Sequence, residues 1–319
     1  MSKYRDALPQ LDGRLFLTDS GMETTLIFLE GWDLPEFASC DLLRSEKGTE
    51  AVVDYYLRHL EIARKAGTGF ILESPTWRSS PDWGSKIGYS NDELEAINLK
   101  AVGLMAKIRD EHDSEDLPIV VSGCIGPRGD GYVVEEIMTA DEARTYHRPQ
   151  IKTYAAAGAD MVTAITMTHT EEAIGVAMAA QDNGLPVAIS FTVETDGRLP
   201  SGETLEAAIE RVEWATELYP AYYMINCAHP THFDHVLDAS APWVSRIKGL
   251  RANASRCSHA ELEAATELDA GDPVELGLQY GELYKTFPHI TVMGGCCGTD
   301  HRHVEQISVV CAPLAHAHA

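Results

Sequence analysis

The chain contains no long apolar segment. No part of its 319 residues approaches the ~18 consecutive apolar side chains that a membrane-spanning helix requires. The first stretch, MSKYRDALPQLDGRL, also has no apolar core of the length found in signal peptides. Both absences argue against membrane insertion and export, so we expect a cytoplasmic protein that does not bind a membrane.

Basic side chains are also scarce. Lysine and arginine number 25 against 49 acidic residues, which gives a formal net charge of −24. This charge repels the phosphates of nucleic acids and of anionic lipids, so we expect neither as a partner. The chain also lacks Ser- or Pro-rich linkers and breaks in composition, which predicts a single domain over residues 1–319.

The cysteines do not form the pattern of a disulfide framework, because there are seven of them in a large chain. In a reducing compartment, clustered cysteines more often bind metal or act chemically. Two are adjacent in the stretch HITVMGGCCGTDHR, residues 289–302. Alone, this pair is consistent with a strained disulfide, a redox pair, two incidental residues or two ligands of one soft metal ion.

What the chain does contain is a regular series of short β-rich runs. They cover residues 14–19, 69–74, 118–123, 160–166, 185–191, 222–227, 247–253 and 289–295. Most are continuous in Val, Ile, Leu, Phe or Met, which is typical of parallel strands buried on both faces.

Helical patterns lie between these runs. They cover residues 48–67, 91–112, 139–158, 170–184 and 202–220, and a last helix starts near Asp300. We expect Asn91 to cap the second helix, and Thr139 with Glu142 to cap the third. Eight βα units predict an α/β protein with one (β/α)8 barrel of the TIM type. The alternative is a doubly wound open sheet, but TDSGMETTL lacks the GxGxxG fingerprint expected after its first strand.

The barrel brings three cysteines together. Active sites of such barrels lie at the carboxyl ends of the strands. Cys227 ends the sixth predicted strand, and Cys296 and Cys297 follow the eighth. Three thiolates suit zinc, which accepts soft ligands in tetrahedral geometry, and three protein ligands leave the fourth position open, as in catalytic sites.

The chemistry of such a site follows from its charge. Three thiolates make the ion a poor generator of hydroxide, but they suit it to capture a thiol substrate and lower its pKa from ~8.5. A thiolate held in this way attacks a soft electrophile such as an activated methyl group, so no side-chain base is required. We therefore expect one Zn²⁺ per chain, with the three cysteines as ligands and catalytic groups. Gly294, Gly295 and Gly298 permit positive φ angles that would let the adjacent thiols face one ion.

Other residues compete for these roles. Three histidines shortly after Cys227 are alternative ligands, although we favour sulfur: His229, His232 and His235. Cys124 ends the third strand and either lines the barrel mouth or is a small buried residue. The remaining cysteines have no partner in this pattern and are expected to be structural: Cys40, Cys257 and Cys311.

Together these segments resemble the homocysteine S-methyltransferase family. The resemblance rests on INCAHP and GGCCGTDHRHV, on TDSGMETTL at the first strand, on GCIGPRGDGY after the third and on SFTVETDGRLPSGETLEAAI around the fifth. It covers essentially the whole chain and implies zinc on the three cysteines. The reaction it implies (EC class 2.1.1) passes a methyl group to homocysteine and forms methionine. Because no cobalamin or folate domain is evident, a small onium donor such as S-methylmethionine or a betaine-like compound fits best.

The resemblance also implies substrate-binding residues. Asp19 and Gly21 belong to a DSG segment that stands where the family has DGG, and they match a loop that packs over the amino acid. Asn226 lies beside the first zinc ligand, and backbone amides near Gly294 and Gly295 would help to hold the carboxylate. The alternatives to these roles are a cap or turn carboxylate for Asp19 and a strand-end turn residue for Asn226.

One departure from the family concerns the acceptor. Many members carry, after the fourth strand, a glutamate that grips the ammonium of homocysteine, whereas Ile165 or Thr166 stands here. A buried ammonium without a carboxylate is costly. Glu73, at the end of the second strand, is the expected replacement, unless it is a solvent-facing acid. Trp77 and Trp83 are candidates for a box around a methylated cation, the alternative being ordinary packing.

The leading hypothesis is a zinc-dependent methyltransferase that acts on a small-molecule thiol, homocysteine, with a small-molecule methyl donor. The missing glutamate motivates a second hypothesis, a related methyltransferase or demethylase with another acceptor or donor. A third is a non-catalytic zinc- or thiol-binding barrel. A hydrolytic zinc barrel is disfavoured because no HxH follows the first strand. The sequence leaves open which donor is used and whether the chain forms a homo-oligomer.

Overall fold

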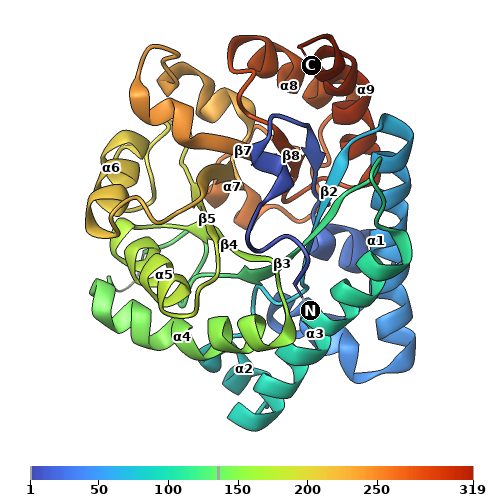
Figure 1. Ribbon diagram of the computed structural model, residues 1–319, viewed down its shortest axis with the longest axis vertical. Coiled ribbons are helices and arrows are strands. Elements are labelled where there is room, and N and C mark those ends of the chain that lie inside the picture. Colours follow the sequence, from blue (N-terminus) through green and yellow to red (C-terminus); the bar gives the residue numbers. More distant parts are fainter. Residues whose placement is uncertain (1, 135–136, 319) are drawn as a thin grey trace.

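The strands close into a barrel in the computed structural model, which describes residues 2–134 and 137–318. Eight parallel strands follow one another around the ring in sequence order, and β8 pairs with β1 (Figure 1). They are β1 Phe16–Leu17, β2 Gly69–Glu73, β3 Ile119–Ile125, β4 Met161–Met167, β5 Val187–Thr192, β6 Tyr222–Asn226, β7 Ile247–Ala252 and β8 Val292–Gly295. The predicted barrel is therefore confirmed, and the open-sheet alternative is excluded.

Helices surround the barrel and fill the connections between strands (Figure 1). They are α1 Glu46–Ala66, α2 Pro81–Lys86, α3 Asn91–His112, α4 Ala140–Ala157, α5 Thr170–Asp182, α6 Leu205–Ala215, α7 His259–Ala264, α8 Pro273–Thr286 and α9 His301–His318. The sequence predicted α1, α3, α4, α5, α6 and α9 but not the short α2 and α7, nor α8, which packs against α9. Within the part of the chain that the structure describes, no helix is both long and apolar enough to cross a lipid bilayer.

Two helix starts can be compared with their predictions. Thr139 caps α4 through the predicted capping box with Glu142. The predicted cap of α3 was wrong by one residue, because Ser90 rather than Asn91 is the N-cap. The Ser90 hydroxyl accepts a hydrogen bond from the N–H of Glu93, and the Glu93 carboxylate accepts one from the N–H of Ser90. This reciprocal pair satisfies two backbone donors that an asparagine at the first helical position could not reach together.

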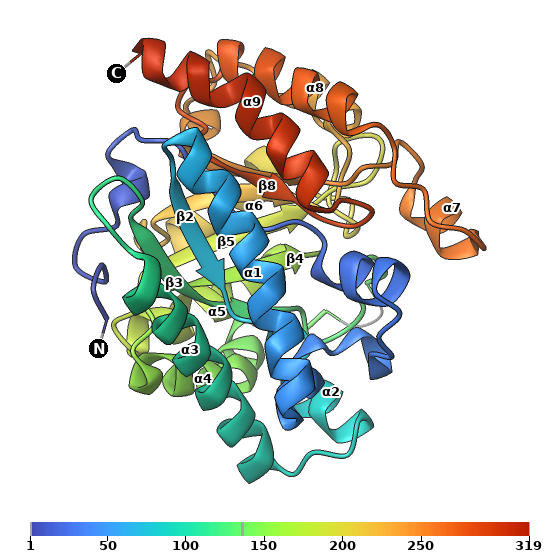
Figure 2. The same cartoon turned by 90° about the vertical axis from the view of Figure 1, so that its right-hand side faces the viewer.

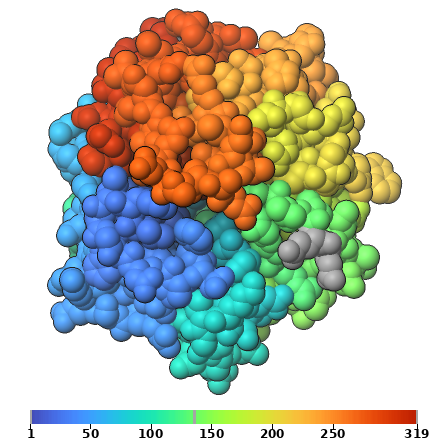
Figure 3. Space-filling model, turned by 180° about the vertical axis from the view of Figure 1, so that it is seen from behind, coloured from blue at the N-terminus to red at the C-terminus, as the bar shows by residue number. Residues whose placement is uncertain are grey.

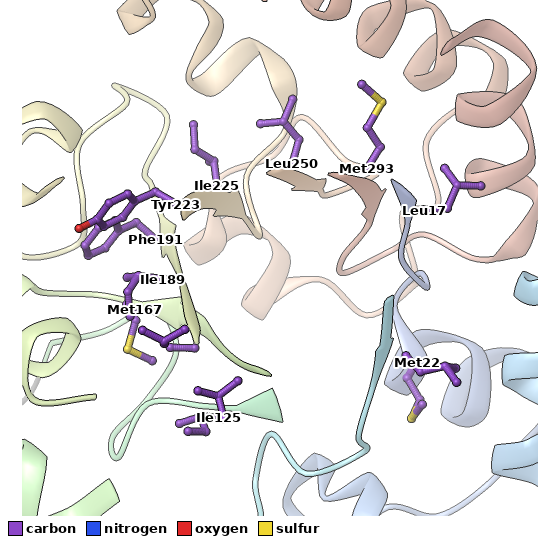
Figure 4. Close-up of a cluster of buried hydrophobic side chains, with 14 of the residues drawn as sticks. Leu17, Met22, Ile125, Met167, Ile189, Phe191, Tyr223, Ile225, Leu250 and Met293 are labelled. Carbon is purple, nitrogen blue, oxygen red and sulfur yellow. The ribbon is translucent and has the colours of Figure 1, made fainter. Parts of the chain in front are cut away.

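Side chains along each strand alternate between the barrel interior and the layer beneath the helices. Outward-facing residues such as Leu17, Ile225 and Leu250 belong to the main hydrophobic core (Figure 4). A second apolar cluster contains the alternate residues near the amino ends of the strands, among them Phe16, Ile71, Val120, Met161 and Tyr222. Further along the same alternate positions the residues become polar: Glu73, Ser122, Thr163, Ser190, Asn226 and Arg251. Buried polar groups require partners, so this end of the barrel is the one built for chemistry.

Several loops extend this end of the barrel. Figure 2 shows α2, α7 and the segment that follows β1 on one side of the molecule, opposite the N-terminus. The strands point toward this side, as the β4 arrow shows. The loops that a TIM barrel uses for substrate binding are thus the longest ones here.

Candidate active site

The carboxyl ends of the strands enclose a cavity of about 380 Å³. Figure 3 views the molecule from this end, where the segments after β1, β2, β3 and β7 meet. The charged and sulfur-bearing residues that line the cavity include Asp19, Glu23, Glu73, Arg78, Cys124, Asp130, Cys227, Arg251, Cys296 and Cys297. A larger depression of about 900 Å³ runs along α1, but charged surface residues dominate its lining. The cavity that contains the cysteines is therefore the candidate active site.

Three cysteine sulfurs gather in this cavity, as the sequence predicted. The sulfurs of Cys227, Cys296 and Cys297 all lie within 4.8 Å of one another. Cys227 and Cys296 are joined as a disulfide, and Cys297 is a free cysteine whose sulfur is 3.8 Å from that of Cys227. The adjacent cysteines are thus not bonded to each other, which removes the interpretation of the pair as a disulfide between neighbours.

The spacing of these sulfurs can be tested against a zinc site. Corners of a tetrahedron that lie ~2.3 Å from a zinc ion are about 3.8 Å apart, which is the separation of the Cys227 and Cys297 sulfurs. Cys296 must first be released from its disulfide, because only a thiolate can ligate a metal. The donor set therefore fits a soft divalent ion when the cysteines are reduced.

Asn226 organises the backbone beside the first cysteine. Its Oδ1 accepts hydrogen bonds from the Thr166 N–H (2.9 Å) and the Ser190 hydroxyl (2.6 Å), and its Nδ2 donates to the Thr166 hydroxyl (2.8 Å). Thr166 has a φ of 68° and Cys227 one of 51°, a region that residues other than glycine rarely adopt. Asn226 thus holds a strained strand end in place.

The glycines around Cys296 and Cys297 have a different role from the expected one. Only Gly298 has a positive φ, 79°, so the expectation for Gly294 and Gly295 was wrong. Both belong to β8, where a side chain on Gly294 would collide with Thr18 and one on Gly295 with Thr299. The Gly295 N–H already donates to the Asp19 carbonyl (3.0 Å). These glycines allow the strand to pack closely, which a β-carbon would prevent.

Arg251 occupies the centre of the polar interior, and the sequence did not identify it. Its guanidinium forms ion pairs with both Asp19 (2.7 Å) and Glu73, and it also donates to the carbonyl of Gly295 (3.1 Å). Burial alone would lower the pKa of Arg251, but the two carboxylates raise it above its ordinary value. Burial raises the pKa of Glu73, and Arg251 opposes that shift. Glu73 is therefore buried and already paired, not a solvent-facing acid.

Sequence comparison identifies the family. The sequence profile of the family described as homocysteine S-methyltransferase matches residues 16–311. The chain belongs to the homocysteine S-methyltransferase family. As a member of it, the protein is a methyltransferase. The matched region includes the whole barrel and the three cysteines.

Individual relatives agree with this assignment. The chain is 22% identical over 284 residues to homocysteine S-methyltransferase 1 of Arabidopsis thaliana, covering 82% of this chain and 83% of the relative. It is also 22% identical over 256 residues to a selenocysteine Se-methyltransferase of Brassica oleracea var. italica, covering 72% and 71%.

Solved structures share the fold. The homocysteine methyltransferase MmuM of Escherichia coli in its oxidised form has a TM-score of 0.72 at 19% identity, covering 95% of this chain and 98% of that one. Its metallated form has a TM-score of 0.68 at 18% identity, covering 94% and 97%.

Two aromatic residues of this family member lie beside the cysteines, and the sequence patterns indicated neither. The Tyr132 hydroxyl is 3.1 Å from the Cys297 sulfur and 3.5 Å from that of Cys227. The His259 ring packs on Tyr132 at 4.3 Å, and its Nε2–H donates to the carbonyl of Cys227 (2.6 Å). Tyr132 stands in a glycine-rich loop after β3 that sequence inspection could have flagged. His259 lies in the segment after β7, where no motif marked it.

The histidines proposed from the sequence as competing ligands do not lie in the cavity with the three cysteines. His229 contacts Thr231, and His232 Nε2 donates to the Arg256 carbonyl (2.9 Å). Neither lines the cavity, and nor does the exposed His235. Cys124 is buried and also contributes to the cavity wall. Of the cysteines expected to be structural, two are buried and one is exposed: Cys40, Cys311 and Cys257.

The two tryptophans do not form an open box for a methylated cation. Arg78 lies over the Trp77 ring at 4.3 Å and over the Trp83 ring at 3.4 Å. Lys86 lies over the Trp83 ring at 3.8 Å. Cations of the chain itself therefore occupy these aromatic faces.

Proposed function

We propose that this methyltransferase moves a methyl group from a small onium donor, of the S-methylmethionine or betaine type, to the thiol of homocysteine and so forms methionine. The observation that carries the proposal is the convergence of three cysteine sulfurs in a cavity at the carboxyl end of the barrel. We also propose that residues 1–319 form one domain, and that its partners are the two small substrates.

Cys227, Cys296 and Cys297 would hold one zinc ion when reduced. Bound there, the ion would supply a substrate thiol as thiolate at neutral pH. The other tasks belong to side chains. Asn226 holds the strained end of β4 beside Cys227. The Tyr132 hydroxyl contacts the sulfurs of Cys227 and Cys297, and His259 supports the Tyr132 ring.

The remaining predicted substrate-binding residues fall into two groups, those that line the cavity and those that do not. Asp19, Gly21 and Glu73 line the cavity and can contact a ligand. The Gly21 N–H donates to Thr299 (3.1 Å), which positions the loop next to Cys296. Asn226, Gly294 and Gly295 do not belong to the lining residues, so we propose that they position the cysteines and do not bind the amino acid directly.

A second candidate function differs in its acceptor. Ile165 and Thr166 line the cavity at the end of β4, where many family members carry a glutamate. Glu73 cannot simply replace that glutamate, because Arg251 already binds it. Another thiol or selenol acceptor, or demethylation of a methylated compound, is consistent with these contacts. A competition between homocysteine and other thiols, with product masses as the readout, decides between the two candidates.

Replacement of Cys296 by serine tests the proposed metal site. The change removes one of three soft ligands, so we expect zinc content, measured by elemental mass spectrometry, to fall from about one per chain to near zero. Methyl transfer should be lost with it. Cys257→Ser is the matched control, since Cys257 is exposed and outside the cavity. Undiminished methyl transfer by zinc-free wild-type protein would overturn the proposal.

A further inference from the structure

Arg78 is a buried arginine without a charge partner in the described part of the chain. It lies in the loop after β2, lines the cavity and is only 8% exposed. Its Nε and Nη1 are buried and form no hydrogen bond, and it forms no ion pair within residues 2–134 and 137–318. Arg251, in the same cavity, is by contrast bonded to two carboxylates. Unsatisfied buried donors are rare in native proteins, and each one requires an explanation.

The stacking of Arg78 fixes the orientation of its guanidinium. Trp77 and Trp83 pack against it at 4.3 and 3.4 Å. Aromatic stacking uses the faces of the planar group and leaves its N–H edge for hydrogen bonds. Such a group is held in place before a ligand arrives, so little side-chain entropy is lost when one binds. This edge is complementary to a carboxylate, which accepts two parallel N–H bonds from a guanidinium.

The surrounding charges leave the edge of Arg78 available. Burial lowers the pKa of Arg78, while the carboxylates of Asp130, Glu23 and Glu36 act on it through space in the opposite direction. None of the three forms an ion pair with it in the described chain. Glu23 also lines the cavity and has no ion pair among the described residues. Burial raises its pKa, and a hydrogen bond with Ser39 opposes that shift. Asp130 and Glu263 line the cavity as well without an ion pair among the described residues. Arg78 is thus the lining guanidinium that no carboxylate of the described chain engages, and the cavity offers partners for both charges of a zwitterion.

We propose that Arg78 binds the carboxylate of a zwitterionic amino-acid substrate in this cavity, with Glu23 facing its cationic group. This inference rests on the proposed function, because it assigns a substrate subsite to the same cavity. Two sources share the chemistry, namely the α-amino acid that carries the thiol and a methyl donor that carries its own carboxylate. The experiment separates them.

The test is a double-mutant-type cycle, in which the Arg78 side chain and the carboxylate of the ligand are removed separately and together. Calorimetry on the zinc-loaded protein measures the affinities of two ligand pairs. The acceptor pair is methionine and 3-(methylthio)propylamine, and the donor pair is dimethylsulfonioacetate and trimethylsulfonium. Arg78→Met should reduce the preference for the carboxylate-bearing member of one pair by about 10- to 100-fold, the usual range for a hydrogen bond to a charged group. Lys86→Met is the matched control, because it removes the other cation stacked on Trp83 from outside the cavity.

Each outcome bears on the proposal. An effect in the acceptor pair assigns Arg78 to the amino-acid acceptor, and an effect in the donor pair assigns it to the donor. An unchanged preference in both pairs overturns the proposal and leaves Arg78 as a packing residue. Arg78→Lys, which keeps the charge but loses the fork, repeats the cycle if the methionine variant does not fold. If Arg78→Met lost the carboxylate preference but the wild-type protein transferred no methyl group, the proposed function would be refuted and this inference would stand.

Discussion

At the scale of single residues, Arg251 decides how charge is arranged at the base of the cavity. Two buried carboxylates, Asp19 and Glu73, share its guanidinium, and the Tyr55 hydroxyl also donates to Asp19 (3.0 Å). Removal of one partner from such a cluster would leave a buried charge unpaired, at a cost of several kcal/mol. Arg251 therefore keeps Glu73 from acting as a free acid, and the substrate must find its charge partners elsewhere.

Tyr132 provides a prediction at the same scale. Burial raises the pKa of Cys297 above its ordinary value, and the hydrogen bond from Tyr132 opposes this shift. Tyr132→Phe removes the opposing bond, so the pKa of Cys297 should rise further. The measurement is the pH dependence of Cys297 alkylation in reduced, metal-free protein, localised by fragment-ion mass spectrometry.

A matched control for this variant is Tyr146→Phe. The Tyr146 hydroxyl bonds to Ser80 (3.0 Å) and not to a cysteine, so its removal should leave the alkylation midpoint of Cys297 where it is. If Tyr132→Phe left the midpoint unchanged as well, the hydroxyl would not interact with the thiolate in solution.

At the scale of elements, the contact between β8 and β1 positions the cysteine loop. Gly294 leaves no room for a side chain, since a β-carbon there would collide with the Thr18 hydroxyl and the Asp19 carbonyl. Gly294→Ala should therefore lower the free energy of unfolding by about 1 to 3 kcal/mol through overpacking. Chemical denaturation monitored by fluorescence measures the change.

Gly103 offers a contrasting substitution of the same type. It lies in α3, where a β-carbon added to it would have open space around it, with no neighbouring atom within 4 Å. Gly103→Ala should be neutral or stabilise the protein by up to about 1 kcal/mol, because alanine favours helix. Equal effects of the two substitutions would contradict a specific steric role for Gly294.

At the scale of the whole molecule, buried neutral groups link stability to pH. His59 lies beneath the loop after β1, where its Nδ1–H donates to the Tyr55 carbonyl (2.8 Å) and its Nε2 contacts the Ser20 hydroxyl (2.9 Å). Burial lowers its pKa from 6.5 to about 4. The unfolded chain therefore binds a proton in this interval that the folded protein does not.

The free energy of unfolding should consequently fall as the pH falls from about 6.5 to about 4, with a contribution from His59 on the order of 3 kcal/mol. His59→Gln, which can still donate to the Tyr55 carbonyl, should show a smaller fall across the same interval. Urea denaturation at a series of pH values is the measurement. A variant with the same pH dependence as the wild type would show that His59 is not the group responsible.

Much of the architecture could be predicted because it depends on local patterns. Each predicted β-rich run overlaps a strand, since continuous apolar runs have few other stable environments in a protein of this size. The helix α8 was missed because its apolar residues are spaced among glycines and charged residues, and packing against α9 stabilises it. The error at Ser90 arose because both Ser90 and Asn91 are good caps, and only the position of Glu93 decides between them.

The sequence by itself determined the barrel, the ends of its strands and the three cysteines that meet there. The hydrophobic period, the length of each apolar run and the order of the runs can all be read along the chain. Only the tertiary structure decided which charges remain free. Glu73 and Arg78 are both ionisable residues at the end of β2 or just beyond it, and nothing in their neighbours along the chain distinguishes them. Arg251, 178 residues from Glu73, neutralises one of them, while two tryptophans hold the other without a charge partner in the described chain. Long-range pairing of buried charges depends on three-dimensional proximity, which the order of residues does not show.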